Sequence, residues 1–301
     1  MRITRAWLVL ALSFLVGGSL QALGADRIKP FILASTSNDG VATVAATTRD
    51  QLVDAGYRII GEYAPYENAQ ILVVTSADLI AAATQTDLGE FGAVLRVAVT
   101  DVDEVTQVSY VNPRYLAHAY RLEGDSAAVA DSLSKAIGAE ESFGSARGLS
   151  AKSLRRYHYM IGMEYFRDTY DLGSFDSQEA AVASVAAALE SNDAGLAQVY
   201  RLELEEQDAV LFGVSMAPEG EESKYHNDAF QMSVVDFADL RGTAYLPYEV
   251  LVKKGEVSAL HMRFRMAVHF PDLSMMGKHS FMTLMPSPDA IEAALKTLTQ
   301  N

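Results

Sequence analysis

Two stretches of the chain show the same succession of apolar runs and short charged turns. Residues 242–273 contain two runs rich in β-branched and aromatic residues, which flank Lys253, Lys254, Gly255 and Glu256. Residues 91–122 contain similar runs at 91–100 and 105–111, which flank an acidic turn at 101–104. Apolar runs on both sides of a short charged turn are typical of a β-hairpin. The pattern therefore predicts one antiparallel hairpin in each half of the chain.

Similar elements surround the two hairpins. In the first half, the spacing of apolar residues predicts a helix at 36–56, strands at 57–63 and 70–75, a short helix at 79–83 and a closing helix at 126–137. In the second half, it predicts a helix at 177–189, strands at 196–204 and 209–215, and a closing helix at 288–298. The aromatic segment 157–170 is interpreted as a strand. The two halves therefore share one order of elements.

Residues 139–154 separate the two halves, because Gly, Ser, Ala and charged residues replace the periodic pattern there. Such a change in composition is typical of a domain boundary. The sequence thus predicts an α+β fold with two similar modules, at 26–140 and 155–301. Each module is expected to form a small, mostly antiparallel sheet with packed helices, and the two are expected to pair as an internal pseudo-dimer.

The N-terminal 25 residues have the pattern of a secretory signal. Arg2 and Arg5 precede an apolar run at 6–16, and small residues at 22–25 offer a cleavage site. The apolar run is short for a membrane-spanning helix. We therefore expect export to the periplasm or the medium, with cleavage that leaves no stable membrane anchor.

Composition excludes several kinds of site. The chain has no cysteine, which excludes disulfides, thiolate metal sites and cysteine nucleophiles. Lys and Arg number 24 against 39 Asp and Glu, so the formal net charge is −15, and loss of the two arginines with the signal makes it 22 − 39 = −17. Nucleic acids select clustered basic residues, so no nucleic-acid partner is expected.

The order of helix, Ala-Gly ending and hairpin, with Asn112-Pro113 after the first hairpin, resembles the bacterial family known as domain of unknown function 302. The resemblance covers about residues 30–140 and 160–300. The second half departs from it, because Arg263-Phe264 stands where the first half has Asn112-Pro113. The resemblance implies small α+β domains that tend to pair. It implies no reaction and no catalytic residues, since none is established for the family.

One pair of residues recurs in both halves. When the two hairpins are aligned without gaps, Arg114 falls on Arg265 and His118 on His269, so both halves read Arg-x-x-x-His. A spacing of four places two side chains on one face of either a helix or a strand. Arginine can bind an anion through two hydrogen bonds, and histidine adds a charge that depends on pH. These four residues are therefore predicted to bind a small anionic or planar ligand at the seam of the two modules, although a chance identity or a histidine satisfied by local hydrogen bonds also explains the pattern.

Methionine and aromatic residues suggest an alternative cofactor. After Met1, methionine is absent until Met160, and the ten from Met160 onward include several close to histidines. Thioether and imidazole ligands suit Cu(I), but methionine is also a common filler of irregular cores. Tyr157, His158, Tyr159 and Tyr165 could stack on haem, although core packing accounts for them too. The residues do not identify a metal or a cofactor.

The sequence lacks the common catalytic motifs, namely Gly-x-Ser-x-Gly, His-Glu-x-x-His, the P-loop and Gly-x-Gly-x-x-Gly. Glu249 and His261 form the nearest acid and base, across the second hairpin. A non-catalytic module that binds a small ligand is therefore the first hypothesis for function. The alternatives are a periplasmic Cu(I) or haem carrier and a hydrolase without a recognisable motif. Self-pairing of the modules is expected, and formation of a homo-oligomer is compatible with it.

Overall fold

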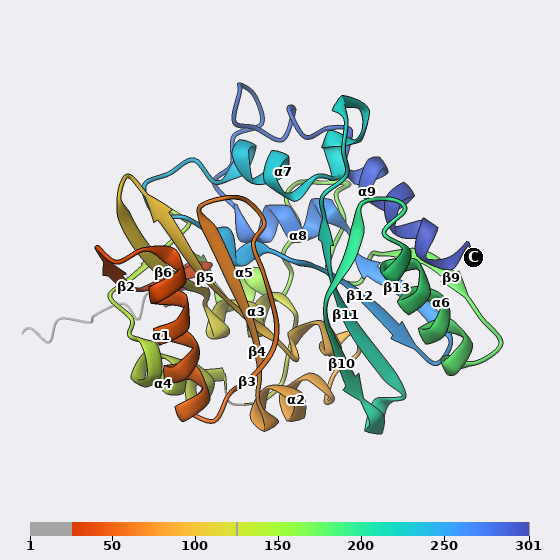
Figure 1. Cartoon of the computed structure of the whole chain (residues 1–301), viewed down its shortest axis with the longest axis horizontal. Coiled ribbons are helices and arrows are strands. Elements are labelled where there is room, and N and C mark those ends of the chain that lie inside the picture. Colours follow the sequence, from red (N-terminus) through yellow and green to blue (C-terminus); the bar gives the residue numbers. More distant parts are fainter. Residues whose placement is uncertain (1–25, 125, 301) are drawn as a thin grey trace, which may run out of the picture.

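A computed structural model describes residues 26–124 and 126–300 of the chain (Figure 1). The predicted signal, residues 1–25, lies outside the described residues. In the described part of the chain, every helix is too short or too polar to cross a bilayer.

The first half folds into an antiparallel sheet with helices beside it. Its elements are β1 (Arg27–Ile28), β2 (Phe31–Ser37), α1 (Val41–Asp54), β3 (Arg58–Tyr63), β4 (Ala69–Thr75), α2 (Ala77–Ala83), the 3-10 helix η1 (Gly89–Gly92), β5 (Leu95–Val102), β6 (Val105–Val111), α3 (Pro113–Ala119), α4 (Ser126–Ile137) and β7 (Glu141–Phe143). The strand order is β3-β4-β5-β6-β2-β7, with every neighbouring pair antiparallel. Helix α1 packs across β3 to β6 and buries Val44, Ala45 and Leu52.

The second half forms another antiparallel sheet. Two short elements precede this sheet in the chain: β8 (Leu149–Ser150) and α5 (Ala151–Leu154). Strand β8 pairs with β1. The elements of the second half are β9 (Thr169–Ser174), α6 (Gln178–Ser191), β10 (Leu196–Leu204), η2 (Glu205–Gln207), β11 (Ala209–Met216), η3 (Glu221–His226), α7 (Asp228–Val235), η4 (Thr243–Tyr245), β12 (Tyr248–Lys253), β13 (Glu256–Leu260), α8 (Met262–His269), α9 (Ser287–Lys296) and η5 (Thr297–Thr299). The strand order is β10-β11-β12-β13-β9, and α6 packs across β10 to β13. The α+β class with antiparallel sheets is therefore confirmed.

Both predicted hairpins are present and close in the same way. Val102 pairs with Val105 across the first turn, and Lys253 pairs with Glu256 across the second. The two turn residues have positive φ in each case: 52° and 68° at residues 103 and 104, and 54° and 84° at residues 254 and 255. Two successive positive φ angles characterise the type I′ turn, whose twist matches that of the strands. Only the second turn contains a glycine, Gly255.

Two sequence predictions were wrong in detail. The predicted helix at 36–56 starts at Val41, and the strand β2 before it was missed, because its polar end, Ser35 to Ser37, reads as a helix cap. The segment 157–168 consists of turns and bends rather than a strand, and β9 starts at Thr169. Residues 141–143, in the predicted boundary segment, form β7 and pair with β2.

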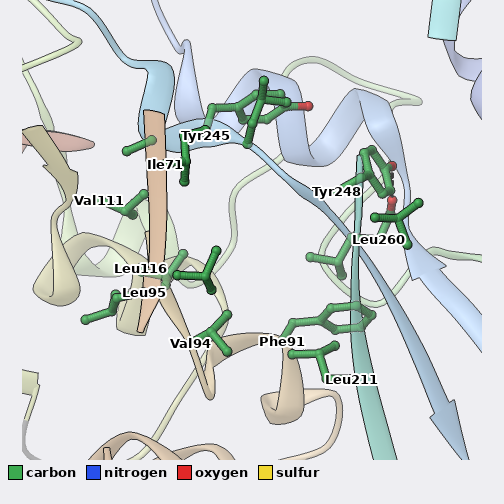
Figure 2. Close-up of a cluster of buried hydrophobic side chains, with 14 of the residues drawn as sticks. Ile71, Phe91, Val94, Leu95, Val111, Leu116, Leu211, Tyr245, Tyr248 and Leu260 are labelled. Atoms are coloured by element: carbon green, nitrogen blue, oxygen red, sulfur yellow. Dashed lines mark hydrogen bonds between the residues drawn. The ribbon is translucent and has the colours of Figure 1, made fainter. Parts of the chain in front are cut away.

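The cores of the two halves are continuous. Figure 2 shows buried residues of both halves in one cluster: Phe91 of η1 lies beside Leu211 of β11, and Tyr245 of η4 lies near Ile71 of β4. The short helix η1 contacts β11 and β12, while η4 contacts β4, β5 and β6. Strands β3 and β10 also lie side by side, and a Cβ atom on Gly61 would meet the Val199 carbonyl oxygen at 2.5 Å. Each half therefore contributes an element to the core of the other.

Candidate functional site

Four charged or titratable side chains are buried together where the two halves meet. Arg96 of β5 comes from the first half, whereas Glu249 of β12 and Arg265 and His269 of α8 come from the second. None of the four is more than 1% exposed. Both Arg96 and Glu249 interrupt apolar runs within their strands, so the sheets carry these charges into the interior. We call these four residues the buried polar cluster.

Glu249 holds both guanidinium groups of the cluster. Its Oε1 accepts a hydrogen bond from Arg96 Nη1, and its Oε2 lies 3.3 Å from Nε of Arg265. Arg96 Nε also donates to the carbonyl oxygen of Ala244 at 3.0 Å, and Arg265 Nη2 donates to that of Tyr245 at 2.7 Å. Since buried charges are stable only when they are paired and hydrogen-bonded, Glu249 joins the two halves electrostatically.

The neighbours of His269 fix its protonation state. Its Nε2 lies 3.3 Å from Arg96 Nη2, which can only donate, so Nε2 must accept. Its Nδ1 lies 2.8 Å from the Arg265 carbonyl oxygen, so Nδ1 carries the proton. Burial, with the charges of Arg96 and Arg265, lowers the pKa of His269 well below its ordinary value. The imidazole is therefore neutral and serves to orient Arg96.

Arg265 lies between two aromatic rings. Its guanidinium carbon is 4.2 Å from the centre of the Tyr245 ring and 4.7 Å from that of Tyr248. Burial alone would lower the pKa of Arg265, but Glu249 and the surrounding tyrosines raise it overall. The cation–π geometry and the ion pair both stabilise the charged form, so Arg265 stays protonated throughout the ordinary pH range.

A second buried carboxylate also joins the halves. Asp228 begins α7, accepts a hydrogen bond from Met216 N at 2.9 Å, and lies 3.5 Å from the hydroxyl of Tyr63 in β3. Burial raises the pKa of Asp228 to about 7, although its hydrogen bonds oppose that shift. This carboxyl group therefore titrates near neutral pH.

The structure separates the two predicted Arg-x-x-x-His pairs. Arg265 and His269 lie together in the buried polar cluster, so His269 is not accessible as the ligand hypothesis requires. Arg114 and His118 lie on α3, where Arg114 is exposed and His118 is half-buried. Counted from the residues that cap the helices, Asn112 and His261, Arg114 is the second position and Arg265 the fourth. The ungapped alignment therefore pairs residues at different positions of the two helices.

Arg114 and His118 belong instead to a surface group of basic side chains, which we call the basic patch. It also includes Arg121, Arg155 and Arg167. Arg121 Nε donates to the Arg155 carbonyl oxygen at 3.0 Å, which places α3 against α5. Burial lowers the pKa of His118, and the charges of Arg155 and Arg114 lower it further. In an acidic protein, this patch is a local region of positive potential.

A cavity of about 390 Å³ opens between the two halves, and we call it the seam cavity. Phe31 and Phe143 of the first half and Phe237 and Phe270 of the second form much of its lining. The Phe31 ring lies 5.5 Å from that of Phe143 and 5.8 Å from that of Phe270. Phe31 also lies 6.0 Å from the ring of His269, so the wall of the cavity rests against the buried polar cluster.

Three charged residues line the seam cavity, and two of them bind the protein itself. Asp236 accepts hydrogen bonds from Gly242 N at 2.7 Å and from the Thr243 hydroxyl at 3.1 Å. Asp272 accepts from Ala146 N at 2.5 Å and from the Ser145 hydroxyl at 3.2 Å. Burial raises the pKa of Asp236 to about 6. The third, Lys29, is half-buried and forms no ion pair with any residue between 26 and 300 that the structure describes.

The other sequence candidates have local partners. Glu249 and His261 do not form an acid–base pair, because Glu249 contacts the two arginines whereas His261 Nε2 lies 3.4 Å from Glu164. The Tyr157 and Tyr159 hydroxyls donate to backbone oxygens of Ala267 and Leu273. Within the described ranges, no three His, Asp or Glu side chains gather as a metal site.

No motif in the sequence marks Lys29, Phe31 or Asp236 as a site residue. Lys29 and Phe31 precede the first predicted element, and Asp236 lies within an apolar run that carries no motif. Comparison of the chain with protein-family models, with curated proteins and with solved structures gives no match, so the site is interpreted from its own geometry.

Proposed function

We propose that this protein binds a small, planar and largely apolar ligand with an acidic group, in the seam cavity and without converting it. The observation that carries the proposal is a cavity of about 390 Å³ walled by phenylalanine rings. Lys29 also lines it and forms no ion pair within the described residues. Ligand pockets are typically mainly apolar, of a few hundred Å³, with a few placed polar groups. Phenylalanine rings favour stacking on a planar ligand, and the Lys29 ammonium group favours an anion at one end.

The carboxylates of the cavity support a binding role over a catalytic one. Asp236 and Asp272 each accept two hydrogen bonds from the protein. These hydrogen bonds order the loops around the cavity, which accounts for the burial of the two carboxylates without a catalytic role. The cavity thus combines an ordered wall with Lys29, a cation that no ion pair within the described residues neutralises, as binding of an anionic ligand requires.

The site also fits a duplicated architecture, which we propose as the origin of the seam. Support comes from the strand orders. In the first half, the strands β2 to β6 lie in the order β3-β4-β5-β6-β2. In the second half, β9 to β13 lie in the order β10-β11-β12-β13-β9, which is the same order when each set is counted from its first strand. The reciprocal packing of η1 and η4 against the opposite halves also supports this proposal, because paired modules would exchange such contacts. Under this proposal, each half is a module similar to domain of unknown function 302, and the N-terminal signal directs the pair out of the cytoplasm.

Two fluorescent probes test the ligand proposal. 1-Anilinonaphthalene-8-sulfonate is aromatic and anionic, and N-phenyl-1-naphthylamine is a neutral analogue. Lys29→Gln should weaken binding of the sulfonate about fivefold, as expected for one partly exposed charge contact of about 1 kcal/mol, and should leave the neutral probe unaffected. Lys135→Gln, at an exposed lysine on α4, is the matched control.

A second variant tests the location. Phe237 is 54% exposed at the cavity, so Phe237→Ser should weaken both probes without lowering the melting temperature. Equal affinities of the wild type, Lys29→Gln and Phe237→Ser for both probes would refute the seam cavity as the binding site.

A further inference from the structure

A second cavity, of about 200 Å³, lies at one end of α8 and is lined largely by methionine. Met163, Met262, Met275, Met282 and Met285 line it, together with Arg263 and several apolar residues. These are five of the eleven methionines of the chain. They come from three separate segments: the loop before β9, the first turn of α8, and the loop between α8 and α9. We call this cavity the methionine pocket.

Three methionines of this pocket, Met275, Met282 and Met285, are not explained by filling of the core. Met216, Met232 and Met266 fill the core and are at most 2% exposed. By contrast, Met275, Met282 and Met285 are 38%, 49% and 60% exposed. Leaving apolar side chains in contact with water gives up the free energy that their burial would contribute. Their placement around a cavity therefore calls for another account.

The backbone holds the three exposed methionines together. Met282 N donates to the Met275 carbonyl oxygen at 3.2 Å, and Met285 N donates to that of Met282 at 3.3 Å. A bridge between Ser274 and Ser280 closes the same loop. Met275, Met282 and Met285 thus belong to one folded loop, and they line a common space with Met262.

We propose that the methionine pocket is a binding site for a soft monovalent cation, Cu(I), with thioether sulfurs as its ligands. Thioethers are soft ligands that select Cu(I) over harder divalent ions. The chain has no thiol that could compete for the ion. This site is separate from the seam cavity and does not depend on the function proposed for it.

Charges near the pocket are compatible with a cation. Arg263, the cationic residue of the lining, donates through Nη1 to Glu164 at 2.8 Å, which neutralises it. Glu164 is adjacent in sequence to Met163, so a carboxylate lies next to the proposed ligands. Because thioethers are neutral, a bound Cu(I) keeps its charge, and the pairing of Arg263 with Glu164 reduces the repulsion between Arg263 and the ion.

The experiment is an anaerobic titration of the full-length mature protein with Cu(I), in competition with bicinchoninate. The triple variant Met275→Leu/Met282→Leu/Met285→Leu keeps side-chain volume and removes three thioethers, so the fold should be retained. We expect Cu(I) affinity to fall at least about tenfold, since even indirect changes at a metal site cost that much. The melting temperature of the triple variant, measured without metal, verifies that it is folded.

The matched control is the variant Met160→Leu/Met276→Leu, which changes two exposed methionines outside the pocket lining. It should bind Cu(I) like the wild type. X-ray absorption of the Cu(I)-loaded protein should show sulfur neighbours, and Ag(I) should compete while Zn(II) should not. Equal affinities of the wild type and the triple variant would overturn the proposal.

Discussion

Replacing Glu249 with Gln tests whether the buried polar cluster joins the two halves. The substitution keeps the shape of the side chain but removes the negative charge that both Arg96 and Arg265 contact. All three side chains are at most 1% exposed, so water cannot replace the lost charge. Breaking a buried ion pair by changing one partner costs about 3–5 kcal/mol. At about 2 °C per kcal/mol for a chain of this size, the melting temperature should fall by about 6–10 °C.

Calorimetry and urea denaturation measure this effect. The control is Glu203→Gln, which removes an ion pair with Arg201 in which both side chains are at least 39% exposed. Such a surface pair contributes only about 0–1 kcal/mol. A double-mutant cycle with Arg96→Gln should give a coupling energy of about 0.5–3 kcal/mol between β5 and β12. If Glu249→Gln is no more destabilising than Glu203→Gln, the cluster does not hold the halves together.

Three further predictions concern other contacts. Arg155→Ala should raise the pKa of His118 towards its ordinary value, because Arg155 is one of the charges that lower it. NMR titration of the imidazole measures this pKa. An unchanged value would contradict the electrostatic contact between Arg155 and His118 in the basic patch. Asp228 has its pKa raised from 3.8 to about 7, so between about pH 4 and 7 the unfolded chain releases a proton that the folded chain keeps, and stability falls as the pH rises. Urea denaturation at several pH values measures how the free energy of unfolding depends on pH. Asp228→Asn should reduce that dependence by up to about 1.4 kcal/mol per pH unit. An identical dependence in the wild type and the variant would refute the raised pKa of Asp228. Gly61→Ala should destabilise the protein by about 1–3 kcal/mol, since the new Cβ would meet Val199 O at 2.5 Å and Tyr200 Cβ at 2.7 Å, whereas Gly40→Ala, with open space around it, should be tolerated.

Local pattern was enough to identify most elements. The helix at 126–137 and the strand at 105–111 agree with α4 and β6 at both ends, and the charged turns are the hairpin turns. These features depend on neighbours in sequence, namely the repeat of apolar residues and the residues in the turn. The spacing of four between Arg114 and His118 is compatible with a helix and with a strand. Only the three-dimensional structure shows that these two residues lie on a helix, α3.

The site depended on contacts that no local pattern records. Arg96 and Glu249 each stand out in the sequence as a charge within an apolar run, which indicates a buried and paired side chain. Their separation of 153 residues leaves the partner undetermined until β5 and β12 approach each other. The seam cavity likewise needs Phe31 and Phe270 from opposite halves. The sequence by itself determined most of the secondary structure, the acidity and the absence of thiols. Tertiary packing decided which charges are buried together, which methionines are exposed and where a ligand can enter, because burial and long-range pairing are set by the approach of elements that are distant in the chain.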